Sequence, residues 1–277
     1  MDYKTLLTVH TTHEPIANLA PVAALARHFD AHMEVVILSA LLPLPTMIVA
    51  ENSDFVWSES LPDLVRRSEE RASAVSDYLQ NEKVRFSTDI EAQQFGQIGK
   101  TVAIPALTAD LIVLNRSSSL LSGIMASTLE GILFAAGKPV FLLGEPIQSV
   151  SIKPEHVMIA WDGSREAANA VHHSLAFLKQ ARSVYAFSIE EVAKSDLRQS
   201  LKSLSRQLTH HAITTQSRLL QADGGTTSQT LIEYVNKCEP DLLVMGAYGH
   251  SRLRELIFSG TSRAALDQLK VPILLAH

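Results

Sequence analysis

The residues best suited to chemistry in this sequence form a glycine- and hydroxyl-rich segment near its C-terminal end. Gly246 and Gly249 follow the apolar run Leu242–Met245, and the run Ser259-Gly260-Thr261-Ser262 begins ten residues after Gly249. Glycines let backbone amides approach phosphate oxygens, and a helix N-terminus adds unpaired N–H groups and a favourable dipole. The segment is therefore suited to holding phosphate groups. A structural alternative is that Gly246 ends a strand and that Thr261 or Ser262 caps a helix.

Asp162 is a second candidate, because it directly follows another short apolar run, Val157–Ala160. Ligands of parallel α/β sheets gather beyond the carboxyl ends of the strands, where the first and fourth strands can be neighbours. We therefore expect Asp162 and Gly246 to share one crevice. A carboxylate there accepts hydrogen bonds from a nucleoside amine or hydroxyl. The alternative is that Asp162 forms an Asx-turn or caps the following helix.

The elements that must position these residues occur twice in the chain. Asp110-Leu-Ile-Val-Leu-Asn115 matches Asp241-Leu-Leu-Val-Met-Gly246, and Lys138-Pro-Val-Phe-Leu-Leu143 matches Lys270-Val-Pro-Ile-Leu-Leu275. A repeat with a period of about 130 residues is too long for a solenoid, so each copy is expected to be a whole domain. We predict one domain over residues 1–146 and a second over residues 154–277.

Runs of Val, Ile and Leu alternate with segments of helical period in both copies. The predicted strands include Leu6–Val9, Val35–Leu38, Arg85–Ile90, Val157–Ala160, Val184–Phe187 and Gln216–Gln221, and the predicted helices include Ala17–Phe29, Asp63–Glu82, Arg165–Lys179 and Ser195–His210. Continuous apolar strands that alternate with helices indicate a parallel sheet covered on both faces. The predicted fold class is α/β, with two doubly wound domains.

The composition excludes several classes of protein. The chain has 24 Lys+Arg and 29 Asp+Glu, a formal charge of −5, which gives no overall attraction to nucleic acid or anionic membrane. No apolar run reaches the roughly 18 residues needed to cross a bilayer, and no secretory signal is recognisable, so we expect a cytoplasmic protein. Cys238, the single cysteine, excludes an intramolecular disulfide and is expected to be a small buried side chain. No spacing of residues indicates a metal site.

The quoted residues resemble the universal stress protein family, and the resemblance extends over both halves. The family pattern is G-x2-G-x9-G-[ST], to which Gly246, Gly249 and the Ser259–Ser262 run correspond. The resemblance implies two tandem flavodoxin-like (Rossmann-like) domains that form a pseudo-dimer through their last strands. It also implies ATP, with or without Mg²⁺, as the ligand of members that bind nucleotide.

The resemblance further implies a role for each residue of the site. Asp162, which follows Ala160 and Trp161, would contact the adenosine, and Met245 would line the base or ribose side. Gly246, Gly249 and the turn Ser259, Gly260, Thr261 and Ser262 would hold the phosphates.

The sequence departs from the family pattern in two places. The third family glycine falls on Ser259, which is tolerated at negative φ but would obstruct a phosphate if the position needs positive φ. In the first copy Asn115 replaces the first glycine, and Thr11 stands near the place of Asp162. We interpret the first copy as degenerate, kept for pairing or for another ligand.

Two functions compete on these observations. The leading hypothesis is a stress-response protein whose C-terminal half binds ATP or a related adenine nucleotide and so sets its conformation or its protein partner. No general base is aligned with a nucleophile, so catalysis would be slow ATP hydrolysis at most. The alternative is an interaction module of the same fold that has lost nucleotide binding. The apolar last strands Val140–Leu143 and Val271–Leu275 predict edge-to-edge pairing, within one chain or in a homodimer.

Overall fold

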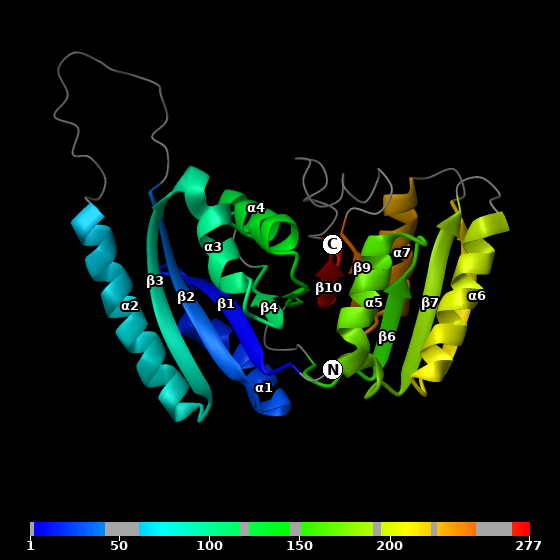
Figure 1. Cartoon of the computed structure of the whole chain (residues 1–277), viewed down its shortest axis with the longest axis horizontal. Coiled ribbons are helices and arrows are strands. Elements are labelled where there is room, and N and C mark those ends of the chain that lie inside the picture. The colour runs from blue at the N-terminus through cyan, green and yellow to red at the C-terminus, as the bar shows by residue number, and fades with distance from the viewer. Residues whose placement is uncertain are drawn as a thin grey trace, which may run out of the picture.

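The computed structural model of the chain describes residues 3–41, 61–116, 122–144, 151–190, 195–222, 226–247 and 268–277. They form one sheet of ten strands in the order β3-β2-β1-β4-β5-β10-β9-β6-β7-β8 (Figure 1). The strands are β1 Thr5–Thr11, β2 His32–Leu41, β3 Arg85–Gln94, β4 Leu111–Leu114, β5 Val140–Leu142, β6 His156–Ala160, β7 Ser183–Glu190, β8 Thr215–Gln221, β9 Leu242–Gly246 and β10 Ile273–Ala276. The α-helices are α1 Ala20–Phe29, α2 Leu61–Asn81, α3 Ile98–Ala106, α4 Ser122–Glu130, α5 Arg165–Leu178, α6 Ser195–His210 and α7 Thr227–Cys238, with short 3-10 turns η1 Ile16–Leu19 and η2 Phe95–Gln97 and a π-helical segment η4 Gly131–Ala136.

The strands of each half run parallel to one another. In the first half β1 lies between β2 and β4, and in the second half β6 lies between β7 and β9. This confirms the predicted doubly wound sheets and the predicted adjacency of the first and fourth strands. The repeat is therefore a repeat of topology as well as of sequence.

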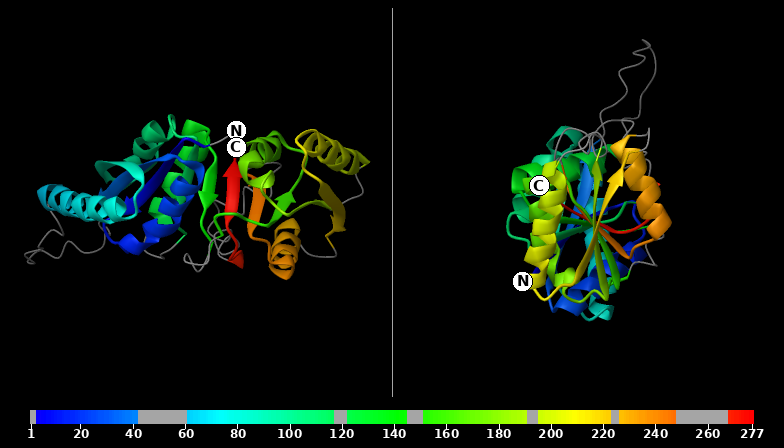
Figure 2. Two further views of the ribbon diagram at one scale, coloured as in Figure 1. Left: turned by 90° about the horizontal axis from the view of Figure 1, so that it is seen from below. Right: turned by 90° about the vertical axis from the view of Figure 1, so that its right-hand side faces the viewer.

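Helices cover both faces of the sheet. Buried side chains of α1, α2, α5 and α6 form one apolar cluster with the sheet, which includes Val22, Leu79, Leu175 and Leu204. Those of α3, α4, η4 and α7 form a second cluster on the opposite face, which includes Val102, Leu129, Ile132 and Val235. Helices α2 and α6 lie at the two ends of the molecule, and β10 lies in its middle (Figures 1 and 2).

The two halves use the same hydrogen-bonded frame. The carboxylate oxygen Oδ2 of Asp110 accepts the backbone N–H of Lys4 and Thr5, at 2.7 and 3.0 Å. In the second half Oδ2 of Asp241 accepts the N–H of Glu155 and His156, at 2.9 and 2.8 Å. Each aspartate thus ties the start of its fourth strand to the start of its first strand. Because these bonds are equivalent, Thr5 of β1 corresponds to His156 of β6.

The halves are joined by the antiparallel pairing of β5 with β10, in which Phe141 lies opposite Leu274. The edge pairing predicted from the last strands therefore takes place within one chain and produces the expected pseudo-dimer. A second contact joins the halves, because Arg116 of the first half donates hydrogen bonds to the backbone carbonyls of Leu269 and Val271.

An aromatic cluster fills one face of this junction. Phe177 of α5 packs against the rings of Phe29 and Phe141, with both centroid distances 5.3 Å, and against Tyr3 at 5.7 Å. The hydroxyl of Tyr3 donates a hydrogen bond to the backbone carbonyl of His173, also on α5. One side chain of the second half thus lies among three aromatic rings of the first half.

Three sequence predictions need correction. The predicted helix Ala17–Phe29 is a 3-10 turn followed by α1, because Pro21 fits the first turn of an α-helix but not its interior. β10 begins at Ile273 rather than Val271, after Pro272, which has no N–H to donate. Cys238 is exposed rather than buried, because it is the last residue of α7 and lies beyond the buried part of that helix.

Truncation of Phe177 should weaken both the fold and the coupling of the halves. We expect Phe177→Ala to lower the free energy of unfolding by about 3–5 kcal/mol, because it empties a fully buried aromatic site. The matched control is Phe187→Ala, since Phe187 is as buried but its ring contact is with Tyr234 of the second half. Chemical denaturation followed by circular dichroism should show a single transition in the control and two separated transitions in Phe177→Ala. A single transition in both variants would contradict the role of Phe177 as the coupling residue.

Stability should fall on acidification through the junction histidine. Burial and the nearby charges of His172 and Lys138 hold the pKa of His173 below its ordinary value of 6.5. The folded state therefore binds its proton less readily than the unfolded state, so stability is lost as pH falls from about 6.5 towards the folded pKa. We expect the melting temperature to drop less between pH 7.5 and 5.5 in His173→Gln than in the wild type. An unchanged slope in His173→Gln would refute the assignment.

Candidate functional site

The predicted site residues come together at the carboxyl ends of β6 and β9. Ala160 pairs with Met245 in the parallel register, and Gly246 is the last residue of β9. The segments that carry Asp162 and Gly246 therefore leave the sheet side by side, as the sequence predicted. Gly249, Ser259, Gly260, Thr261 and Ser262 lie outside the described residues, so their predicted contact with phosphates stays a prediction.

Asp162 is held by the start of α5. Its Oδ1 accepts the backbone N–H of Ser164 at 2.9 Å and the Ser164 hydroxyl at 2.5 Å. Ser164 is the N-cap of α5, and its hydroxyl oxygen accepts the N–H of Ala167 at 3.1 Å. The predicted Asx-turn is therefore present, but it uses one carboxylate oxygen. Among the described residues, both hydrogen bonds to the Asp162 side chain end on Oδ1. Oδ2 is therefore available to another donor.

Trp161 is fixed against the neighbouring strand and helix. Its N–H donates to the Phe187 carbonyl at 2.8 Å, and its own carbonyl accepts the Ser188 hydroxyl at 2.6 Å. The indole Nε1–H donates to the hydroxyl of Ser200 on α6 at 2.9 Å. The indole is therefore held against α6, and the backbone that precedes Asp162 is held against β7.

Gly246 is in close contact with α5. A Cβ atom at this position would lie 2.5 Å from the backbone nitrogen of Ala167, which is nearer than any real contact. Met245 is 1% exposed and Ala160 is 9% exposed, and both belong to the core cluster on the α7 face. In the described structure these three residues thus lie beneath the site, where they are covered by protein atoms.

Charged groups surround the first turn of α5. Burial alone would raise the pKa of Glu166, but its backbone hydrogen bond, Arg165 and His277 together lower it. Nδ1 of His277 lies 3.9 Å from Oε1 of Glu166, and burial lowers the pKa of this histidine. The His277 ring also meets Phe134 of the first half edge-on, at a centroid distance of 4.7 Å. The start of α5 is thereby in contact with the other half of the molecule.

The equivalent position in the first half has a different set of side chains. Because Thr5 of β1 is equivalent to His156 of β6, counting along both strands makes His10 equivalent to Trp161 and Thr11 equivalent to Asp162. The frame that equates Asp110 with Asp241 places Asn115 where Gly246 stands. The predicted counterpart of Asp162 is confirmed as Thr11, and the first half lacks both the carboxylate and the glycine.

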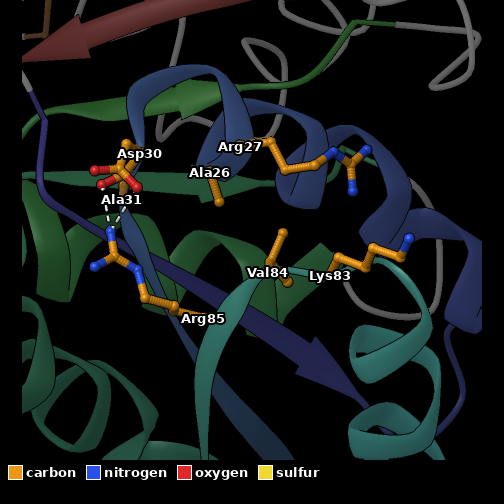
Figure 3. A pocket seen from close by; sticks show the side chains of 7 residues that line it. All are labelled: Ala26, Arg27, Asp30, Ala31, Lys83, Val84 and Arg85. Atoms are coloured by element: carbon orange, nitrogen blue, oxygen red, sulfur yellow. Dashed lines mark hydrogen bonds and ion pairs between the residues drawn. The ribbon is translucent and has the colours of Figure 1, made fainter.

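A separate pocket of about 450 Å³ lies at the opposite, amino-terminal ends of β2 and β3 (Figure 3). Its two arginine side chains are already engaged. Arg85 donates to the backbone carbonyl and carboxylate of Asp30, at 2.7 and 2.8 Å, and Arg27 donates to the carbonyl and carboxylate of Glu82, at 2.8 and 2.7 Å. These bonds satisfy carbonyls at helix ends, so the pocket is explained by helix capping.

The carboxyl-end edge of the second half thus brings together a helix N-terminus, a carboxylate with one available oxygen and a glycine at a strand end. Such a helix end favours an anion, and the carboxylate favours a neutral or cationic donor group. In the part of the chain that the structure describes, no three His, Cys, Asp or Glu side chains gather as a metal site, and no helix is long and apolar enough to cross a membrane.

The second half of the chain matches a known protein family. Residues 154–277 match the universal stress protein family. A curated relative, universal stress protein Slr1230 of Synechocystis sp. (strain ATCC 27184 / PCC 6803 / Kazusa), is 23% identical over 177 residues. The match covers 60% of this chain and 57% of the relative, so the chain spans a little over half the length of that protein.

Solved structures extend the similarity of fold to the first half. A universal stress protein from Archaeoglobus fulgidus DSM 4304 superposes with a TM-score of 0.69 at 14% identity, covering 98% of this chain and 95% of the other. A functionally unknown protein from Pseudomonas aeruginosa PAO1 gives 0.59 at 13% identity, covering 99% and 92%. The universal stress protein fold is therefore shared by the whole chain, although the family match covers the second half.

Sequence reasoning missed the residues that hold the site in shape. Ser164 had a local signal, because Asp-Gly-Ser before a helical run is a capping pattern. Ser188 and Ser200 had none, since they reach Trp161 from a different strand and helix. Their role depends on the packing of α6 and β7, which local sequence does not specify.

Gly246 should be required for folding as well as for any ligand. We expect Gly246→Ala to lower the free energy of unfolding by about 1–3 kcal/mol, because the new methyl group would overlap the backbone of Ala167. Gly96→Ala is the matched control, since a Cβ there meets nothing within 4 Å, and it should change stability by less than about 0.5 kcal/mol. Denaturant titration of the two variants measures both values. Equal stability would show that α5 does not pack on the end of β9.

Proposed function

We propose that the C-terminal half binds an adenine nucleotide, with ATP as the expected ligand, at the carboxyl ends of β6 and β9. Through this site the protein would act as a nucleotide-responsive stress-response protein. The observation that carries the proposal is the placement of Asp162 beside Gly246 at the N-terminus of α5. The match of residues 154–277 to the universal stress protein family supports it.

Each group of the crevice has a defined task in this proposal. Oδ1 of Asp162 is bound by Ser164, so the carboxylate is held in one orientation and Oδ2 is available to accept a ribose hydroxyl or an adenine amine. The amides after Gly246 would approach the phosphates, which the Ser259–Ser262 run would also hold. In the described part of the crevice no base is aligned with a nucleophile, so the site is suited to binding rather than to fast catalysis.

Contact between the halves offers a route from nucleotide to response. His277 touches Glu166 at the start of α5 and Phe134 of the first half. A phosphate near α5 would change the electrostatic surroundings of Glu166 and His277. The bound state would thereby differ from the free state at the junction, where a protein partner could distinguish them.

One observation favours the alternative, an interaction module without nucleotide. Gly246 and Met245 are both accounted for by packing, since one permits the approach of α5 and the other is buried. Under this alternative the glycine at the strand end is a structural remnant, and Ser259 blocks the phosphates.

Mass spectrometry of the nucleotide released from denatured, purified protein decides between these functions. We expect ATP or ADP at about one per chain. Two per chain would show that the first half also binds nucleotide. No nucleotide, together with no thermal shift on adding ATP–Mg²⁺, would favour the interaction module.

Asp162→Asn tests the role of the carboxylate without removing the Asx-turn, because the amide oxygen can still accept from Ser164. Loss of a hydrogen bond to a charged group costs about 1.5–3 kcal/mol, so the Kd for ATP should rise roughly tenfold to a hundredfold. Thr11→Ala, at the counterpart position of the first half, should leave the Kd unchanged. Isothermal titration gives both values, and an unchanged Kd in Asp162→Asn would remove this residue from the site.

A further inference from the structure

The first half contains buried polar side chains that no hydrogen bond satisfies. Thr8, His10, Glu14 and Asn115 are 0%, 0%, 6% and 2% exposed, and each has at least one buried nitrogen or oxygen without a hydrogen-bond partner. Buried polar groups in folded proteins nearly always have partners, and leaving one without a partner costs free energy. A cluster of this kind therefore indicates an occupant that supplies the missing interactions.

His10 and Glu14 lie within hydrogen-bond distance of each other but lack the alignment of a hydrogen bond. Nδ1 of His10 lies 3.2 Å from Oε2 of Glu14, yet neither atom makes a hydrogen bond, so the ring N–H direction does not point at the oxygen. A hydrogen bond from an imidazole requires the N–H to be directed at its acceptor. The two atoms are therefore close together but not hydrogen-bonded to each other.

A shared cation explains this spacing. Two ligand atoms about 2.1 Å from one metal ion lie roughly 3.0 Å apart at an octahedral angle and roughly 3.4 Å apart at a tetrahedral angle. The observed 3.2 Å falls between these values. The turn in which the Glu14 N–H donates to the Thr11 carbonyl brings the carboxylate back to the end of β1.

Asn115 is placed to supply a third ligand. The register of β1 with β4 pairs Thr8 with Val113, and continued by two residues it brings His10 beside Asn115. Neither the oxygen nor the nitrogen of its amide has a partner. Strand order reverses between β1 and β4, which is where ligands bind in doubly wound sheets.

The same positions in the second half carry no such cluster. Trp161 stands in place of His10 with its N–H bonded to Ser200, and Gly246 stands in place of Asn115. The unsatisfied groups are therefore a property of the first half and not of the fold.

We propose that the first half binds one divalent transition-metal ion, Zn²⁺ or Mn²⁺, through His10, Glu14 and the amide oxygen of Asn115. An imidazole nitrogen with two oxygen ligands suits these ions better than Mg²⁺ or Ca²⁺. Among the described residues no third His, Cys, Asp or Glu joins the pair, so the amide oxygen and water complete the coordination. The metal gives Nδ1 of His10, Oε2 of Glu14 and the amide oxygen of Asn115 a partner and fixes the end of β1, and it makes the first half a second binding site of different chemistry.

Metal titration of the full chain tests this proposal. Protein stripped with EDTA and free of nucleotide is titrated with Zn²⁺ by calorimetry, and with Mn²⁺ by electron paramagnetic resonance. We expect one saturable site per chain and a rise in melting temperature on adding Zn²⁺. Mg²⁺ should bind at least tenfold more weakly than Mn²⁺.

Three variants separate this site from surface binding of metal and from misfolding. Glu14→Gln keeps the size of the side chain and should weaken Zn²⁺ at least tenfold, whereas His13→Ala removes an exposed neighbouring imidazole and should change nothing. Asn115→Asp adds a negative ligand and should tighten Zn²⁺ at least threefold, which an unfolded variant would not do. Absence of a saturable site in the wild type, equal affinity in Glu14→Gln, or no tightening in Asn115→Asp would each overturn the proposal.

Discussion

The antiparallel pairing of β5 with β10 is the constraint on which the rest of the structure depends. It turns two parallel half-sheets into one sheet, so its two strands are edge strands in each half but central strands in the whole. Val140, Phe141, Leu274 and Leu275 are each at most 1% exposed, which an isolated half would not provide. Because the strands run in opposite directions, α1 and α5 lie on the same face, and Phe177 of α5 reaches the aromatic rings of the first half.

Within this frame the two halves keep the same backbone and differ in their site residues. Asp110 and Asp241 make the same hydrogen bonds at the start of the strands, far from the carboxyl ends. At the carboxyl ends the side chains differ. His10 of the first half is equivalent to Trp161 of the second, and Asn115 is equivalent to Gly246. The side chains at the carboxyl ends can therefore differ between the halves without loss of fold, because they are separate from the residues that set the strand register.

Much of the fold follows from local sequence, and less of the site does. Runs such as Leu111–Leu114 are apolar at every position, which is typical of parallel strands buried on both faces, so strand order and repeat were predictable. The adjacency of Asp162 and Gly246 followed from the fold class alone. The packing of Gly246 on Ala167, the bond from Trp161 to Ser200 and the approach of Glu14 to His10 were not predictable. Each depends on how a helix or turn lies on the sheet, which is set by contacts between residues far apart in the chain.

The central position of β10 has a consequence for the way the chain folds during synthesis. Strand β5 is complete at Leu142, whereas β10 is made about 130 residues later. At about 5–20 residues per second, the ribosome needs roughly 6 to 25 seconds for that stretch. For this interval the apolar edge of β5 in the nascent first half has no partner strand, which favours aggregation. The exposed edge of the first half is therefore covered only when the last strand of the second half is inserted beside it.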